Sequence, residues 1–482
     1  MLPTLPLVLI GVADLSAAFL FMYGLKRMSS PVTAPSGILA AGIGMLVAVA
    51  ASFLYIFSAN DATQPFLATN VGLAIIALMI GGGVAWWSGK RVAMTAMPQM
   101  VALYNGMGGG AAGAIAAMEL FGGRAQGLMP LIVTLAGALI GAVSMSGSVI
   151  AWAKLDGLLS NPWRFKGQQA VNVIAFAVTI AIGAYLTLAS LGTLVPVLGI
   201  TTLITIFFGC ALVFGILMTM PIGGADMPVV ISVFNAFTGL AVALEGFVLQ
   251  KPALMVAGMV VGAAGLLLTL LMANAMNRSV SNILFTNFGP SVTQKQGDIK
   301  GSLRPTEAGD AGIAMRYAAS VIIIPGYGLA VAQGQQKLYE FVKLLQSAGV
   351  LVRFAIHPVA GRMPGQMDVL LAEAGVPYDL ILQLEDINDD FANTDVVMVI
   401  GANDVVNPAA RTDKPSPIFG MPILNADKAK QVFVVKRGEG KGYAGIVNTL
   451  FYGENCNMVC GDAQAVLVKM IEAVRPLGRA AA

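Results

Sequence analysis

The chain has 482 residues, a net charge of +3 and a hydrophobic fraction of 57%, with only 11% of its residues charged. So small a net charge, without a basic patch interleaved with aromatic residues, argues against nucleic-acid binding. Three cysteines cannot build a disulfide framework, and a single histidine, His357, excludes a histidine-based metal centre, so we expect no metal site.

The charged residues are unevenly distributed along the chain. Only 16 of the 53 precede residue 279, and this first part is rich in Gly and Ala, as lipid-embedded helix bundles are. The remainder has the charge density of a soluble domain. We therefore expect a transmembrane helix bundle over residues 1–276, a linker over residues 277–312 and a soluble domain over residues 313–482.

The apolar part holds nine stretches that could span a membrane, which takes about 20 apolar residues. The first lacks a basic leading region, so it is typical of a spanning helix rather than of a cleavable signal. The stretches are residues 5–25, 38–57, 70–87, 97–121, 128–153, 169–190, 194–218, 227–249 and 253–275.

Basic residues at the ends of these stretches predict the orientation. Cytoplasmic loops carry an excess of Lys and Arg. One set of alternate connections holds only Arg124 and Lys251, which places the N-terminus outside and the soluble domain in the cytoplasm. The other set holds Lys26, Arg27, Lys90, Arg91, Lys154, Arg164, Lys166 and Arg278.

Polar residues inside a membrane span are costly and are therefore functional candidates. Asn105 lies in a glycine-rich stretch whose small residues let a neighbouring helix approach closely. Ser232 and Asn235 share a helical face with Gly239, and Asp226 opens the same helix. We take Asn105, Asn235, Asp226 and Ser232 as candidates for an ion path. Interhelical hydrogen bonds, and a helix cap for Asp226, are the alternative structural roles.

Three further acids in the apolar part are expected near helix ends or facing other subunits, and not in such a path. They are Asp14, Glu119 and Glu245.

The soluble part alternates strand-like runs with helical stretches, clearest at residues 329–348, 367–374 and 463–474. Six strands with crossover helices in fewer than 180 residues predict a doubly wound parallel sheet, a Rossmann-like α/β domain. The expected strands are residues 320–324, 351–356, 380–384, 395–400, 431–435 and 457–460.

A glycine turn follows the first of these strands. Gly326 and Gly328 precede a helix-forming sequence, which is the arrangement that holds a pyrophosphate in dinucleotide folds. The third fingerprint position is Val331 instead of glycine, and no acid stands about 20 residues on to take a ribose hydroxyl. By itself the pattern is weak.

Three loops at the ends of later strands strengthen it. Residues 357–365 offer glycines and Arg362, residues 401–408 follow the fourth strand, and Lys436 and Arg437 open a glycine-rich loop over residues 436–443. Ligands of such sheets bind at these ends, and adjacent cations suit a 2′-phosphate, which favours NADP over NAD. Each cation alone could be a solvated surface charge. His357 fits a hydrogen-bonded structural role at least as well as a catalytic one, because hydride transfer between nicotinamides needs no protein acid.

Longer motifs carry a specific resemblance over nearly the whole chain. They are Pro-Gly-Tyr-Gly (325–328), His-Pro-Val-Ala-Gly-Arg-Met-Pro-Gly (357–365), Gly-Ala-Asn-Asp-Val-Val-Asn-Pro (401–408), Gly-Met-Pro (420–422), Lys-Arg (436–437), Gly-Tyr-Ala-Gly (442–445), Gly-Asp-Ala (461–463), Gly-Gly-Ala-Asp-Met-Pro-Val-Val (223–230) and Ala-Met-Asn-Arg-Ser (275–279). With these motifs the sequence resembles the β subunit of the proton-translocating NAD(P) transhydrogenase.

The resemblance implies NADP(H) on this chain, with the cofactor reversed across the sheet relative to ordinary dinucleotide folds. Lys436 and Arg437 would hold the 2′-phosphate, and Asp404 would belong to a motif linked to coupling. The implied contacts are Tyr327, Val359, Ala360, Gly361, Arg362, Met363, Pro364, Gly401, Ala402, Asn403, Asp404, Val405, Gly420, Met421, Lys436, Arg437, Gly438, Glu439, Gly440, Lys441, Gly442, Tyr443, Asp462 and Ala463.

The resemblance also implies partners and a location. NAD(H) would bind an α subunit that carries further transmembrane helices, in a dimer of αβ units in the bacterial inner membrane. Hydride transfer would be coupled to proton translocation, mainly to make NADPH. Some relatives have a histidine where this chain has Asn105, so we expect the titrating group on a companion subunit, or a hydrated path oriented by Asn105 and Asn235. The alternative function is an ion transporter with a dinucleotide-sensing domain.

Overall fold

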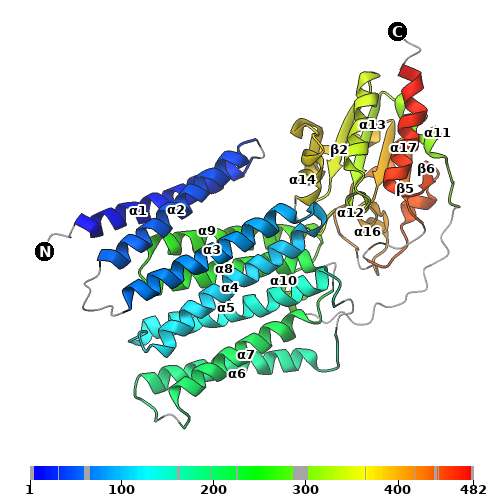
Figure 1. Cartoon of the computed structure of the whole chain (residues 1–482). Coiled ribbons are helices and arrows are strands. Elements are labelled where there is room, and N and C mark those ends of the chain that lie inside the picture. Colours follow the sequence, from blue (N-terminus) through cyan, green and yellow to red (C-terminus); the bar gives the residue numbers. More distant parts are fainter. Residues whose placement is uncertain are drawn as a thin grey trace. The chain divides into compact units, whose positions relative to one another are not determined.

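The computed structural model describes residues 5–30, 32–58, 66–159, 163–195, 197–223, 226–285, 302–363, 365–416, 418–438, 442 and 444–478. The chain divides into two compact units. One comprises residues 1–223 and 230–269, and the other residues 224–229 and 270–482. Figure 1 shows the long helices of the apolar sequence and the strands that follow them.

Each of the nine predicted spanning stretches contains a long helix. Eight of these, all but α4, are apolar and long enough to cross a membrane, within the part of the chain that the structure describes. Glycines and polar residues make α4 less hydrophobic, although it has 25 residues. The helices are α1 (Leu5–Met28), α2 (Ala34–Ser58), α3 (Leu67–Arg91), α4 (Met97–Phe121), α5 (Leu128–Leu155), α6 (Gln168–Ser190), α7 (Ile200–Thr219), α8 (Met227–Val248) and α9 (Pro252–Ala275).

Small residues let these helices approach closely, as the glycine spacing predicted. A Cβ added to Gly141 on α5 would lie 2.7 Å from the Gly109 carbonyl oxygen and 2.8 Å from the Gly113 nitrogen of α4. A Cβ on Gly239 of α8 would lie 2.6 Å from Gly262 Cα of α9. Since tight backbone contact maximises van der Waals packing in lipid, glycines at these positions stabilise the bundle.

The second unit contains a six-stranded parallel sheet in the order β3-β2-β1-β4-β5-β6. This order confirms the predicted doubly wound sheet and reverses direction between β1 and β4. Its inner strands are buried hydrophobic runs, as parallel strands covered on both faces must be. The strands are β1 (Ser320–Pro325), β2 (Leu351–Ile356), β3 (Ile381–Gln383), β4 (Val396–Ile400), β5 (Gln431–Lys436) and β6 (Cys456–Cys460).

The helices predicted over residues 367–374 and 463–474 are confirmed, the one predicted after β1 differs, and α10 and the start of α11 lie in the stretch predicted as a linker. The expected helix over residues 329–348 was wrong, because Gln333 has a positive φ of 51° and divides it into α12 and α13. At Gly334 the backbone approaches Leu329, whose Cδ1 would lie 2.9 Å from an added Cβ. The helices are α10 (Val280–Phe285), α11 (Ala308–Arg316), α12 (Tyr327–Val331), α13 (Gln335–Ser347), α14 (Gln366–Glu373), α15 (Leu384–Ile387), α16 (Ala409–Thr412) and α17 (Ala463–Val474).

Short 3-10 turns connect several of these elements. They are η2 (Met94–Ala96), η4 (Tyr378–Leu380), η5 (Asp390–Asn393), η6 (Asp404–Val406), η7 (Ala426–Lys428), η8 (Thr449–Tyr452) and η9 (Arg475–Gly478).

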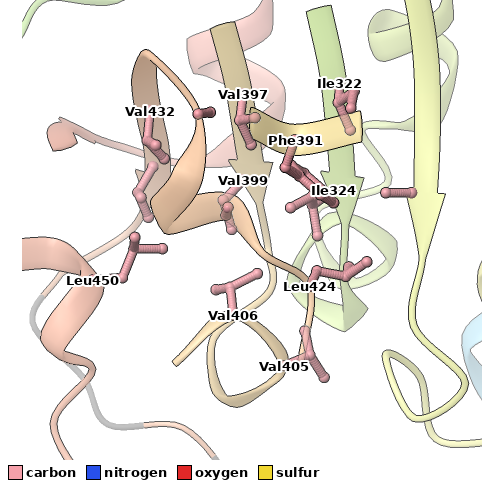
Figure 2. Close-up of a cluster of buried hydrophobic side chains, with 14 of the residues drawn as sticks. Ile322, Ile324, Phe391, Val397, Val399, Val405, Val406, Leu424, Val432 and Leu450 are labelled. Atoms are coloured by element: carbon pink, nitrogen blue, oxygen red, sulfur yellow. The ribbon is translucent and has the colours of Figure 1, made fainter. Parts of the chain in front are cut away.

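A hydrophobic core supports the loops at the carboxyl ends of the strands. Figure 2 shows Val399 of β4 in the same cluster as Val405 and Val406, which follow that strand, and Leu450 of η8. All four are buried to at least 94%. The loops that carry the predicted site are therefore anchored in the packed core through their own apolar residues.

Candidate functional site

The predicted loops lie at the carboxyl ends of adjacent strands. The Gly326 turn follows β1, residues 357–365 follow β2, residues 401–408 follow β4, and Lys436 ends β5. Because β1 and β4 are neighbours whose crossovers run in opposite directions, their loops flank the topological switch point, where such sheets bind ligands. The parallel register thus brings together loops that are over 100 residues apart in the sequence.

The glycine turn after β1 is filled by protein backbone. The N–H groups of Gly326, Tyr327 and Gly328 donate to the carbonyl oxygens of Ile400, Ala360 and Gly401 at 2.9, 3.0 and 2.9 Å. A Cβ on Gly326 would lie 2.6 Å from Ala402 Cα, so only glycine permits this approach.

The expectation that this turn cradles a pyrophosphate is therefore wrong. Its amides hold the loops after β2 and β4, and α12 has only five residues. Gly401, with a φ of +73°, completes the contact, since a Cβ there would collide with the backbone of α12. The turn positions the neighbouring loops instead of holding an anion.

His357 joins two of the predicted loops. Its Nδ1 accepts a hydrogen bond from the Val359 N–H at 3.1 Å, so Nε2 carries the proton that it donates to the Pro422 carbonyl at 2.8 Å. The side chain is 2% exposed, and this burial lowers the pKa of His357 to about 4. His357 is thus a neutral bridge between residues 357–365 and 420–422, which is the structural role that the sequence left open.

Arg362 and Tyr327 face each other across two loops. The guanidinium carbon lies 4.5 Å from the centre of the tyrosine ring, a cation–π contact. The Arg362 N–H donates to Gln366 Oε1 at 2.6 Å. Gln366 is 2% exposed, and its Nε2 has no hydrogen-bond partner among the residues that the structure describes. Sequence reasoning missed Gln366, because its burial against the loop is decided by the fold.

Asp404 fixes the segment that follows β5. Its Oδ2 accepts a hydrogen bond from the Ala444 N–H at 2.9 Å, and its carboxylate interacts electrostatically with Lys436. A side chain at Gly442 would collide with this carboxylate, so glycine is required there.

Lys436 is half-buried, and its ammonium lies 4.6 Å from the centre of the Phe451 ring. Burial lowers the pKa of Lys436, while the Asp404 carboxylate opposes that shift. A positive charge is therefore held at the end of β5 beside a carboxylate from the end of β4.

Buried asparagines tie the same two segments together at their base. Asn448 Nδ2 donates to the Asn403 carbonyl at 2.9 Å, and Asn407 Nδ2 donates to the Val447 carbonyl at 3.2 Å. Asn407 Oδ1 accepts from the Ala409 N–H at 3.1 Å. Asn407 and Asn448 are at most 2% exposed, and neither was among the predicted contacts. Their buried partners are far apart in sequence, so only the fold identifies them.

The remaining predicted positions differ in their surroundings. Gly420 has a φ of +80°, and Met421 lies in a small apolar cluster with Ala444. Asp462 caps α17 by accepting from the Gln464 N–H at 3.1 Å, and Ala463 is buried. Arg437 and Gly438 are exposed. Pro364, Glu439, Gly440, Lys441 and Tyr443 lie outside the described residues.

Comparison with known proteins assigns this architecture. A family model described as NAD(P) transhydrogenase beta subunit matches residues 10–473. NAD(P) transhydrogenase subunit beta of Rhodospirillum rubrum is 40% identical over 484 residues, covering 96% of this chain and 98% of that protein. The subunit of a specified strain of the same species gives the same values. The chain belongs to the NAD(P) transhydrogenase beta subunit family.

Membership confirms the interpretation drawn from the motifs and favours it over a dinucleotide-sensing ion transporter. A transhydrogenase is an oxidoreductase that uses nicotinamide nucleotides, and a beta subunit implies an alpha subunit as its partner.

Polar side chains of the membrane helices α4, α5 and α8 are joined by hydrogen bonds. The Asn105 side chain on α4 donates from Nδ2 to Ser148 Oγ on α5 at 3.0 Å. The main-chain carbonyl of Asn105 accepts a hydrogen bond from Thr238 Oγ1 of α8 at 3.3 Å. Thr238 Oγ1 lies 2.6 Å from Ser144 Oγ of α5. We name these four residues, Asn105, Ser144, Ser148 and Thr238, the polar column. Each is at most 9% exposed.

The other candidates for an ion path lie elsewhere. Ser232 Oγ donates to the Gly265 carbonyl of α9 at 3.0 Å, and Asn235 is only partly buried. Asp226 pairs with Arg278 at 2.7 Å. The structure therefore brings Asn105 together with Thr238, and places Ser232 against a different helix.

Proposed function

We propose that the C-terminal part of this chain binds NADP(H) at the carboxyl edge of its sheet, and that NAD(H) binds the partner alpha subunit. The observation that carries this assignment is the half-buried Lys436 at the end of β5, beside Asp404 and followed by the exposed Arg437. A 2′-phosphate accepts charge-assisted hydrogen bonds from two cations. The residues present fit that group.

The surroundings of β2 support NADP over NAD. Where an NAD site would carry an acid for the ribose hydroxyls, this chain has His357, which is buried and neutral. Arg362, on its loop after β2, supplies a further cation, stacked on Tyr327. Tyr327 and the glycines of residues 357–365 allow a ligand to approach the backbone closely.

We further propose that the enzyme couples hydride transfer from NADH to NADP⁺ with proton movement into the cytoplasm. When bound, the two nicotinamides supply the redox chemistry, and the protein positions them and excludes water. Asp404 is the coupling candidate on this chain, because it holds both Lys436 and the backbone of Ala444. A change in that contact would alter the affinity for NADP(H). Through such a change in affinity, a proton gradient can drive hydride transfer.

The proposal includes an arrangement in the cell. Residues 1–276 would lie in the bacterial inner membrane with the N-terminus in the periplasm, and residues 313–482 would lie in the cytoplasm after the linker 277–312. The basic residues at alternate helix ends support this orientation. The working assembly would be a dimer of αβ units.

NADPH binding to the purified αβ complex tests the site. Replacing Lys436 and Arg437 with Ala should weaken NADPH binding by several kcal/mol at most, since each charged hydrogen bond contributes about 1.5–3 kcal/mol. NADH binding should not change, because NADH lacks the 2′-phosphate. Lys469→Ala, an exposed change on α17, is the matched control. An unchanged NADPH dissociation constant in the double variant would refute the assignment.

Coupling is tested in sealed vesicles that contain the αβ complex. Reduction of an NADP analogue by NADH should accelerate when a pH gradient of the correct sign is imposed. A rate that ignores the gradient would refute coupling and leave the binding assignment intact.

A further inference from the structure

Glu245 lies fully buried near the end of α8, within the bundle of this chain. Neither of its carboxylate oxygens has a hydrogen-bond partner among the described residues. Its carboxyl packs directly on Gly137 of α5, where any side chain would collide with it. Glu245 therefore lies near a helix end, which is one of the two expected positions, and its carboxyl is buried within this chain.

The position of Glu245 continues the polar column. Glu245 follows Thr238 by seven residues on α8, and Gly137 precedes Ser144 by seven residues on α5. Seven residues are two helical turns, about 10 Å. The Glu245–Gly137 contact is thus the same interhelical contact as Thr238–Ser144, displaced two turns toward one end of the bundle.

A third helix contributes a second acid, nearer to the same end of the bundle. Glu119 follows Asn105 by fourteen residues on α4 and interacts electrostatically with Glu245. Glu119 lies 3.7 Å from Arg124, whose side chain is 68% exposed, whereas that of Glu119 is 13% exposed. A graded series therefore runs from the surface at Arg124, through Glu119, to the buried Glu245.

The polar groups of this bundle differ in whether they can take up and release a proton. Hydroxyl and amide groups can donate and accept hydrogen bonds but do not titrate near neutral pH, whereas a carboxyl can hold and release a proton. An ionised carboxylate without a partner is costly to bury. Glu119, which interacts with it electrostatically, has the same sign, and the carboxyl packs on Gly137 of α5, which has no side chain.

We propose that Glu245 is the proton-carrying residue of this membrane bundle, between the surface at Glu119 and Arg124 and the polar column. The inference rests on the proposed proton coupling. One proton passes from water at that end to the carboxylate, and one passes from the resulting carboxyl through bound water to the hydroxyls of the column. Only O–H bonds form and break, and no electrons move. In the proposed orientation, Glu245 receives protons from the periplasm.

The test uses the αβ complex in sealed vesicles with an imposed pH gradient. Glu245→Gln keeps the shape of the side chain but cannot carry a proton, so acceleration by the gradient should fall by about 100-fold, the usual contribution of a positioned acid or base. NADPH affinity should stay unchanged. Asp14→Asn, the same change at a buried acid of α1, is the control and should keep the full response.

Two readouts separate a proton carrier from a packing residue. In Glu245→Asp the response to the gradient should persist with a shifted pH profile, and the infrared carbonyl band of a protonated carboxyl should disappear in Glu245→Gln. An intact gradient response in Glu245→Gln would overturn the role of Glu245 and leave coupling standing. If Glu245→Gln loses NADPH binding, the pH dependence of the gradient response in Glu245→Asp becomes the test of the proposal. A shifted profile supports the proton-carrying role, and an unshifted profile overturns it. A wild-type enzyme without any response would instead refute the proposed coupling.

Discussion

Acid should weaken the C-terminal part of this protein through His357. Burial lowers the pKa of this histidine from 6.5 to about 4. Since the folded pKa lies below the unfolded one, the unfolded chain binds more protons between these values, and stability falls as the pH falls through them. From about pH 7.5 to about pH 5.5, His357 alone should cost the fold roughly 1.3 kcal/mol.

The cysteines of β6 provide an assay for unfolding of the sheet. Cys456 is fully buried and Cys460 is exposed at the end of the same strand. A thiol reagent that works in acid should label Cys460 at once, and Cys456 only when the sheet opens. Labelling of Cys456 against urea concentration therefore measures the free energy of unfolding, with Cys460 as the reference for reagent reactivity at each pH.

The comparison is between wild type and His357→Gln, whose amide can still donate to the Pro422 carbonyl but does not titrate in this range. Other groups titrate equally in both proteins, so their effects cancel. The loss of stability on acidification should be about 1.3 kcal/mol smaller in the variant. Equal losses in the two proteins would show that His357 does not carry the effect.

Two glycines give further predictions. Gly442→Ala should displace the Asp404 carboxylate and weaken NADPH binding about tenfold, roughly 1.4 kcal/mol. The control is Gly309→Ala on α11, where an added Cβ makes only an ordinary contact and the affinity should not change. Equal affinities of the two variants in a binding titration would contradict the Asp404 contact. Gly141→Ala should push α5 away from α4 and cost about 1–3 kcal/mol by overpacking. Gly209→Ala, with open space around its Cβ, should be neutral, and the temperature at which the solubilised bundle aggregates distinguishes them.

Strands and membrane helices could be predicted because their signals are local. All six expected strands differ from the observed strands by at most one residue at each end, and each expected span contains a helix. Where a tertiary contact intervenes, prediction failed. The helix after β1 breaks at Gln333, because the backbone at Gly334 packs on Leu329.

For the candidate site, the sequence indicated which loops matter but gave the wrong role to one of them. Gly326 and Gly328 read as an anion cradle, yet their amides bind the carbonyls of Ile400 and Gly401. These carbonyls lie more than 70 residues away, and only the parallel pairing of β1 with β4 brings them into reach. Asn407 was noted only as part of a motif, since its role depends on Val447.

By itself the sequence determined the long apolar helices, the parallel sheet and the family, because hydrophobic periodicity and long motifs are properties of contiguous residues. The tertiary structure alone decided which polar groups are buried without partners. Glu245 has the same local sequence signal as any acid near a helix end, and only the folded bundle, in which it packs on Gly137, removes it from water. Burial depends on the neighbours that folding supplies, so a proton-carrying role could be inferred only from the assembled bundle.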